Sequence, residues 1–412
     1  MNPRRRHDRF TAVLIAVTCA ATSCSKGTGR SATTAAAESN RPATVTATSG
    51  NATSDNTTSD NTTAQQNGSL TSRATTLPRA GGACAITRAA VDPLGEITFV
   101  ESDKLFTTDS LGRSSHCLLD LRNNAVTSLS WSPSGARLLL DGDVVADANG
   151  VRVSGFLPTN SDVQWSGPNG TSLLASTAAG RLVKRNSTTS ARTDVTFLDR
   201  HDSSAYHPAG KAIISLGSGF DANTAEKTVG VWLADNGGRG SRLLVRDESA
   251  AAIGEPRFDS SGAKLYFLAA HAGGTSHVHV YDIEGGTLEV AYQAKSAFDR
   301  LVTSGVDEDT WAVRVGDCSA KASVVAAFGS EPLPLNQPEL NGQAVEPVGW
   351  LANRVLLVIA RPQGCTGPGS LWRISDVGLG VKIADNVSAA APRTVRALAK
   401  ELSIPLGRQV VA

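Results

Sequence analysis

A short unit of apolar runs separated by turn residues recurs along most of the chain. Its clearest copy, at 128–142, reads SLSWSPSGARLLLDG. An aromatic residue ends the first run, a Pro-x-Gly turn follows, and RLLL begins the next run. Proline presets a negative φ, and glycine accepts the positive φ that ends such a turn. The pattern predicts two short antiparallel strands, of which the second is covered on both faces because it is apolar throughout.

Related units follow one another at nearly regular intervals. Their anchor residues are Val91, Trp131, Trp165, Tyr206, Phe258, a degraded copy near Ser304, and Trp350. A mean spacing of about 43 residues with several short strands per unit is typical of propeller blades. One blade exposes both faces, and packing blades around a ring covers them. The sequence therefore predicts an all-β fold, a seven-bladed β-propeller of four-stranded antiparallel blades, with six blades as the alternative.

The repeated motif, aromatic-Ser-Pro-x-Gly followed by apolar residues, resembles the TolB-type, WD40-like propeller repeat. WSPSG at 131–135 is the closest copy, and FDSSG at 258–262 is the next. The aspartate that this family places before the glycine is replaced in every copy, by Ser134, Asn169, Ala209 and Ser261. The resemblance covers most of residues 85–390 and implies the propeller fold. It implies no single activity, because this fold carries many.

The first 23 residues have the pattern of a lipoprotein signal peptide. Four arginines precede an apolar run at 11–21, which is too short to span a bilayer. The following ATSC resembles the bacterial lipobox, whose cysteine is diacylated and becomes the new N-terminus. Lipidation is therefore expected at Cys24, and an ordinary secretory cleavage site with a chance cysteine is the alternative.

Residues 24–82 differ in composition from the rest of the chain. They are rich in Ser, Thr, Ala and Asn and contain few large apolar residues. Such a segment buries too little surface to offset its ordering entropy, so a disordered tether is predicted. The tether would hold a folded propeller domain, 83–412, off a bacterial cell membrane on its extracytoplasmic side. Whether the tether is glycosylated is left open.

Charge and motifs narrow the functional classes. The chain has 39 basic and 38 acidic residues, which gives no electrostatic argument for nucleic-acid binding. It contains neither G-x-S-x-G nor H-E-x-x-H, so no catalytic residue is assigned and no cofactor is expected. We expect a non-catalytic scaffold that binds an envelope protein or ligand. A propeller enzyme or small-ligand sensor that uses the central channel is the alternative.

Cysteines support an exported domain. Cys19 would leave with the signal peptide and Cys24 would be lipidated, so four remain: Cys84, Cys117, Cys318 and Cys365. Four cysteines allow three pairings. The repeat alignment favours Cys84–Cys117 and Cys318–Cys365, because the latter two fall at equivalent positions in adjacent blades. A zinc site is disfavoured because no C-x-x-C spacing occurs.

The turns between second and third strands suggest a binding surface. They are short in the first three units and longer in the next four, and in a propeller they all emerge on one face. Because loops on a rigid scaffold are common binding sites, we predict a binding crescent there. Its candidate residues are Phe220, Asp221, Asn223, His271, Lys321 and Arg361. The alternative is that the longer turns are tolerated insertions without a role.

Two further patterns resemble metal sites. His271, His277 and His279 form H-x5-H-x-H, and the last two would share one face of a strand. Such residues are more often ordinary strand positions, so no metal is predicted. The acidic stretch 141–150 faintly resembles a calcium loop, but it lacks the D-x-D-x-D-G order and is interpreted as hairpin turns.

Overall fold

The computed structural model describes residues 75–76, 96–113, 115–121, 125–142, 144–147, 151–153, 162–167, 170–189, 191–246, 250–271, 273–316, 322–329, 331–352, 354–362 and 364–393. All of them belong to the second of two compact units into which the chain divides, residues 68–412. The predicted signal peptide, Cys24 and all of the predicted tether except β1 (Thr75–Thr76) lie outside the described residues. Among the described residues, no helix is long and apolar enough to cross a membrane.

Five antiparallel sheets each contain one run of four consecutive strands. The first sheet contains β5 (Leu129–Trp131), β6 (Arg137–Leu140), β7 (Val144–Asp147) and β8 (Val151–Val153), and is extended by β1; the second contains β9 (Asp162–Ser166), β10 (Ser172–Ser176), β11 (Leu182–Asn186) and β12 (Arg192–Asp194). The third contains β13 (Arg200–Tyr206), β14 (Ala212–Asp221), β15 (Glu226–Asp235) and β16 (Arg242–Arg246); the fourth contains β17 (Ala250–Phe258), β18 (Lys264–His271), β19 (Ser276–Asp282) and β20 (Leu288–Ala294). The fifth contains β21 (Phe298–Thr303), β22 (Thr310–Val315), β23 (Ser323–Phe328) and β24 (Leu333–Pro334).

A sixth sheet joins strands from both ends of the described chain. In spatial order it contains β25 (Ala344–Leu351), β26 (Val355–Arg361), β27 (Gly369–Ile374), β28 (Gly380–Pro392), β2 (Ile97–Glu101), β3 (Lys104–Thr108) and β4 (Ser115–Asp120). The single helical element among the described residues is a 3-10 turn, η1 (Pro338–Leu340).

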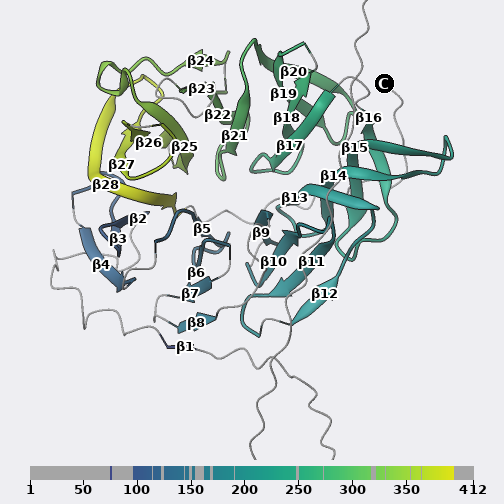
Figure 1. Ribbon diagram of the computed structural model, residues 1–412, viewed down its shortest axis with the longest axis horizontal. Helices are drawn as coiled ribbons and strands as arrows, with labels where there is room; N and C mark the ends of the chain where they lie inside the picture. The colour runs from purple at the N-terminus through teal and green to yellow at the C-terminus, as the bar shows by residue number, and fades with distance from the viewer. Residues whose placement is uncertain are drawn as a thin grey trace, which may run out of the picture. The chain divides into compact units, whose positions relative to one another are not determined.

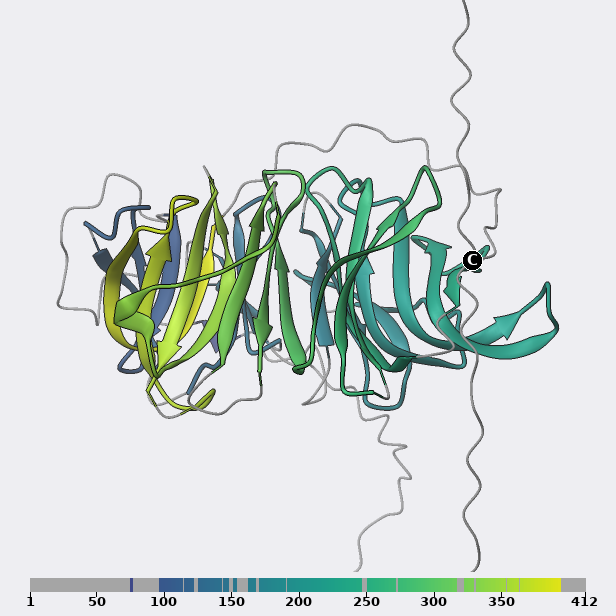
Figure 2. The same ribbon diagram turned by 90° about the horizontal axis from the view of Figure 1, so that it is seen from above.

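The sheets of this unit are arranged around a common centre (Figure 1), and their strands run along the axis of the ring (Figure 2). Hydrophobic clusters fill the spaces between successive sheets. One cluster joins Leu216 of β14 to Phe267 of β18, and another joins Leu139 of β6 to Trp165 of β9. Because each sheet buries both faces against neighbours, the fold is an all-β propeller of four-stranded antiparallel blades, as predicted. Six sheets are counted among the described residues, and the count of seven blades remains a prediction.

The predicted anchors that fall within the described residues lie in a strand or directly after one. β5 ends at Trp131, β13 at Tyr206 and β17 at Phe258, and the degraded copy near Ser304 forms β21 and β22. The turn after Phe258 depends on Gly262, whose φ is +80°. A Cβ atom there would lie 2.3 Å from Nε2 of His207, so both conformation and space require glycine.

β28 closes the ring by pairing with a strand from each end of the chain. Its first part pairs with β27, from Ile374↔Gly380 to Gly369↔Val387, and its last part pairs with β2, from Glu101↔Val387 to Ile97↔Pro392. The repeat alignment predicts a different partner for β2. Residues near Val91 were expected to form the first strand of the first unit and to pair with β2. Those residues lie outside the described part, and β28 occupies the neighbouring position beside β2. Closure therefore comes from residues 387–392.

We expect Val387→Ala to lower the free energy of unfolding by about 1.5–3 kcal/mol, because Val387 is fully buried in one cluster with Phe99 and Leu371, at the point where β28 changes partner. Denaturant unfolding measures this change. Val381→Ala on the same strand is the control, since Val381 is 43% exposed, and should change stability by less than about 0.5 kcal/mol. Equal effects of the two substitutions would contradict this account of closure.

Candidate functional site

The β14–β15 hairpin projects beyond the sheet to which it belongs. The two strands pair along ten residues each, from Ala212↔Asp235 to Asp221↔Glu226. β13 pairs with β14 only as far as Ser218, and β16 pairs with β15 only as far as Gly230. Figure 2 shows this teal hairpin projecting from the rim of the ring. The projecting segment, 219–229, is the most prominent departure from the compact ring.

Glycines allow the base of the hairpin to pack tightly against its neighbours. A Cβ atom at Gly219 would lie 2.7 Å from Cδ2 of Leu198 and 3.2 Å from the Trp232 ring. A Cβ atom at Gly230 would lie 2.3 Å from the carbonyl oxygen of Val245. Side chains at these positions would push the hairpin off the sheet. The sequence GSGF and the later VGVW therefore set where the hairpin leaves the sheet.

The tip of the hairpin is organised by the carboxylate of Asp221. It accepts hydrogen bonds from the backbone N–H and the side-chain amide of Asn223, at 3.0 and 3.1 Å, and from the hydroxyl of Thr224 at 3.2 Å. Nη2 of Arg246 donates to the same carboxylate at 3.0 Å. These hydrogen bonds, led by the one from the Asn223 backbone, hold the pKa of Asp221 below its usual value. The tip is thus ordered by internal contacts.

One face of the hairpin presents apolar side chains to solvent. Phe220 is 63% exposed and Val229 is 53% exposed. Phe220 pairs with Lys227, and Ser218 pairs with Val229, so alternation along the strands puts all four on one face. Lys227 is held at 3.0 Å from Asp199 by an ion pair. We refer to Phe220 and Val229 as the hairpin patch.

A buried histidine supports the segment beneath the hairpin. His201 accepts hydrogen bonds at Nε2 from the backbone N–H groups of Phe197 and Leu198, at 3.2 and 3.1 Å. Its other nitrogen, Nδ1, lies 2.6 Å from the hydroxyl of Ser215. Burial lowers the pKa of His201 to about 4, although the charge of Asp194 acts in the opposite direction. The neutral imidazole therefore holds Leu198 in place under Gly219.

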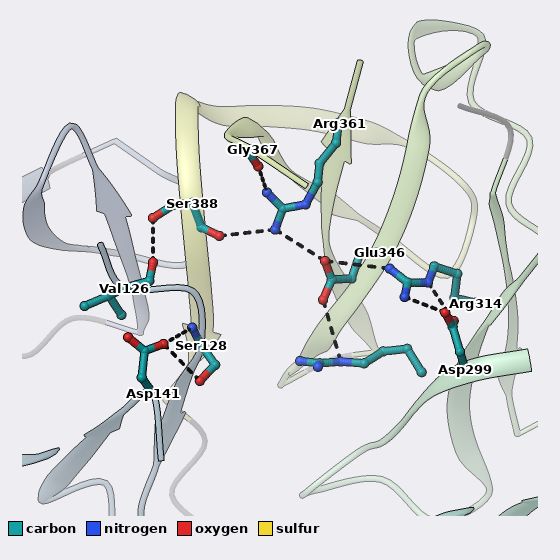
Figure 3. Close-up of polar contacts among 10 residues, drawn as sticks. Val126, Ser128, Asp141, Asp299, Arg314, Glu346, Arg361, Gly367 and Ser388 are labelled. Atoms are coloured by element: carbon teal, nitrogen blue, oxygen red, sulfur yellow. Dashed lines mark hydrogen bonds and ion pairs between the residues drawn. The ribbon is translucent and has the colours of Figure 1, made fainter. Parts of the chain in front are cut away.

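A chain of polar contacts crosses from the β21–β24 sheet to β28 (Figure 3). Arg314 makes two hydrogen bonds with Asp299, both of 2.6 Å, and its Nη1 lies 3.9 Å from Oε2 of Glu346. Arg361 lies 3.3 Å from the same oxygen and donates to the backbone carbonyl of Ser388 at 3.1 Å. Arg361 also donates to the carbonyl of Gly367.

Charge pairing accounts for the burial of this chain. Arg314 and Arg361 keep only 10% and 7% of their side-chain surfaces exposed, and such guanidinium groups require nearby acceptors. Burial by itself would lower the pKa of Arg314, but Asp299 and Glu346 outweigh it and raise that pKa. The chain ends at the Ser388 hydroxyl, which donates to the carbonyl of Val126 at 2.8 Å. Its evident role is to tie adjacent sheets together.

A cavity of about 450 Å³ lies at the centre of the ring. It is lined by strands that open successive sheets and includes Trp131 of β5, Tyr206 of β13 and Thr303 of β21. Its charged lining includes Arg257, which is paired with Glu255 at 2.6 Å, Arg300 and Asp141. No histidine occurs among the described residues that line it.

The described residues of the predicted crescent lie on three elements, the β14–β15 hairpin and the strands β18 and β26. Phe220, Asp221 and Asn223 lie together on the hairpin, as the long turn suggested. Arg361 is 6% exposed at the end of β26 and belongs to the polar chain of Figure 3. His271 ends β18 beside two other histidines. Lys321 lies outside the described residues.

Sequence reasoning missed several residues that the structure places at these sites. Val229 completes the hairpin patch, Arg246 fixes the tip, and Glu346 joins the buried arginines. An alternating strand pattern after the turn could have identified Val229. Nothing in the sequence marks Arg246 or Glu346, because their partners come from distant strands.

The two predicted disulfides, Cys84–Cys117 and Cys318–Cys365, each have one cysteine among the described residues. Cys117 lies in β4, the outer strand of its blade, as expected, and Cys365 lies in the turn after β26. Each of the two is disulfide-bonded. Cys84 and Cys318 lie outside the described residues, so the pairing itself remains a prediction.

Comparisons with known proteins concern the fold. No protein-family profile and no curated protein matches the chain. Similar solved structures include TolB from Acinetobacter baumannii, with 17% identity and a TM-score of 0.42, where the match covers 64% of this chain and 65% of that chain. The Cps50 (Swd1) β-propeller domain from Myceliophteria thermophila is another, at 14% identity and a TM-score of 0.43, covering 67% of this chain and 96% of that one.

An enzyme is also among the similar solved structures. Oligogalacturonate lyase from Vibrio parahaemolyticus has 13% identity and a TM-score of 0.42, with 63% of this chain and 73% of that chain covered. The chain's own ring of four-stranded sheets makes it a β-propeller. No functional conclusion follows from similarities at this level.

We expect acidification to destabilise the native state between pH 6.5 and 4. The unfolded state takes up a proton near pH 6.5, whereas burial lowers the pKa of both His201 and His207 to about 4. Their contribution is complete above pH 6.5 and is lost as the pH falls toward 4. Each contributes up to about 3 kcal/mol. Denaturant unfolding between pH 7.5 and 4 measures the decline.

A matched pair of variants tests whether His201 contributes to this acid sensitivity. His201→Gln keeps an acceptor for the two N–H groups and should reduce the slope of stability against pH. His116→Gln, at a half-buried position in β4, is the control for the loss of a histidine elsewhere in the fold. A wild-type stability that stays flat from pH 6.5 to 4 would contradict the assignment.

Proposed function

We propose that this chain is a cell-envelope lipoprotein whose β-propeller binds a protein partner through the hairpin patch. The observation that carries the proposal is the exposure of Phe220 and Val229 on one face of a hairpin that projects from the ring. Aromatic side chains that fill a pocket on a partner supply much of the affinity of protein interfaces. Because the hairpin is held by close packing at its base and by hydrogen bonds at its tip, little ordering entropy would oppose binding.

The remaining features of the proposal come from the sequence. A signal peptide ending at 23 and a lipid on Cys24 would place the propeller at the outer side of a bacterial cell membrane. The tether would let the hairpin reach a partner at some distance from the lipid. The seven-stranded sheet is consistent with two blades that share β28, which would make seven blades in all.

A second function uses the central channel. Its volume of about 450 Å³ is within the range of small-molecule sites, and Glu255, Arg257 and Arg300 offer charged contacts there. An enzyme or small-ligand sensor would use this cavity. The hairpin patch is favoured because charged groups of the channel are already paired with one another, Arg257 with Glu255 and Arg300 with Glu346 at 3.7 Å.

We expect the double variant Phe220→Ser and Val229→Ser to lose a partner that the intact chain retains. Intact lipoprotein and variant are used for affinity capture from detergent-solubilised envelopes, and bound proteins are quantified by mass spectrometry. A photo-crosslinking residue at position 220 should give one dominant protein adduct in cells. The expected loss is about tenfold or more, corresponding to removal of a central aromatic anchor.

The control keeps the number of removed apolar side chains the same. Val377→Ser with Leu379→Ser removes two residues that are 75% and 70% exposed elsewhere on the surface, and should retain the partner. Thermal melts confirm that both variants fold. Equal capture by all three proteins, or none by any, would refute the hairpin patch and leave the channel as the site.

Lipid anchoring has its own test. Cys24→Ser should abolish incorporation of a radiolabelled fatty acid and move the protein from the membrane fraction to the soluble fraction, because one thioether-linked diacylglycerol supplies the anchor. Cys19→Ser should change neither property. Fatty-acid labelling that persists in Cys24→Ser would show that the lipobox has been misassigned.

A further inference from the structure

Three histidines converge at the turn between β18 and β19. Potential ligand nitrogens of His271, His277 and His279 all lie within 4.8 Å of one another. The ring centroids of His271 and His277 are 4.2 Å apart, and those of His277 and His279 are 5.4 Å apart. Within the described residues, this is the one group of three or more metal-ligating side chains that lies so close together.

Strand register explains why the three rings share one face. Phe267 pairs with His279, and Ala269 pairs with His277. His271 follows Ala269 by two positions, so period-two alternation puts it on the same face. Phe267 belongs to the cluster that packs against the β13–β16 sheet, and the His279 ring stacks on it at 5.2 Å. The histidines therefore continue an apolar interface toward the solvent at the turn.

The three side chains differ in how much of their surface is exposed, as expected for a site that an ion enters from solvent. His279 is 7% exposed, whereas His271 and His277 are half-buried. The inner imidazole is held by its stacking on Phe267, and the outer two lie nearer to the solvent. Ligand nitrogens about 3.4 Å apart are needed for a tetrahedral ion with bonds of about 2.0–2.1 Å. Shifts of roughly 1 Å in the outer rings reach that geometry.

We propose that His271, His277 and His279 bind one Zn²⁺ ion. Three neutral imidazoles are a common donor set for zinc and leave a fourth position for water or an exogenous ligand. Nitrogen donors discriminate against Ca²⁺ and Mg²⁺, which prefer oxygen. The ion would link the end of β18 to β19 across the intervening turn. This site is independent of the hairpin patch and of the central channel.

The test uses the full-length chain with an affinity tag that contains no histidine. After treatment with a chelator and its removal, isothermal titration calorimetry with Zn²⁺ should show one saturable ion per chain. Zn²⁺ should also raise the thermal midpoint, because a ligand that binds the folded state stabilises it. Ca²⁺ and Mg²⁺ should do neither. Visible absorption of the Co²⁺-loaded chain should show the intense bands of tetrahedral coordination.

Variants separate this site from other zinc-binding groups on the chain. His277→Gln and His271→Gln remove half-buried ligands and should each weaken Zn²⁺ binding about tenfold or more and abolish the Co²⁺ bands. His116→Gln removes a half-buried histidine from β4 and should change neither. Melts without metal show whether each variant is folded. Absence of saturable binding by the intact chain, or equal binding by the intact chain and a folded His277→Gln variant, would overturn the proposal.

Discussion

The fold depends on covering both faces of every four-stranded sheet. A single antiparallel sheet with apolar strands such as RLLL or KLYF is insoluble by itself, because each face needs a partner. A ring supplies that partner for every sheet only if its two ends join. β28 meets this requirement by pairing with β27 along one part and with β2 along the other. Buried side chains on both sides of that junction, including Val387 and Phe99, belong to one cluster.

Closure also governs where charged groups can be buried. The chain of contacts from Asp299 through Arg314, Glu346 and Arg361 ends on the carbonyl of Ser388 in β28. Arginines in such a place stabilise the structure only when acceptors are already positioned, since an unpaired buried charge is costly. The ring fixes the positions of the strands that carry these acceptors. The polar chain is therefore a consequence of closure and adds to the links between adjacent sheets.

Tight packing against the ring fixes the positions of the β14–β15 hairpin and of the three histidines. The β14–β15 hairpin leaves a sheet whose inner residues are fully buried, such as Ile214 and Val231, and glycines let it lie close to Leu198 and Trp232. A hairpin without such a base would be marginally stable in water. The three histidines gain from the same packing, because Phe267 fixes the innermost ring. The groups that we propose bind a partner and a metal ion are thus carried on tightly packed elements.

The sequence alone determined the repeating unit and hence the propeller. Trp131, Tyr206 and Phe258 end strands as their motifs indicated, because turn chemistry and apolar runs act locally. It also identified the long turn containing Phe220 and the spacing of the three histidines. The crescent stays a prediction as a single surface, because turn length does not specify which way a side chain points. Arg361 turned inward to Glu346, and Phe220 outward.

Only the tertiary structure decided the contacts between distant strands. The partner of β2 is β28, nearly three hundred residues away. His271 reaches His277 because the turn after β18 folds back in a particular register, and a shift of one residue would have put the rings on opposite faces. Glu346 finds its arginines on three other strands, β21, β22 and β26. Local propensity sets strands and turns, whereas pairing and burial depend on the whole ring, because each sheet takes its position from the two beside it.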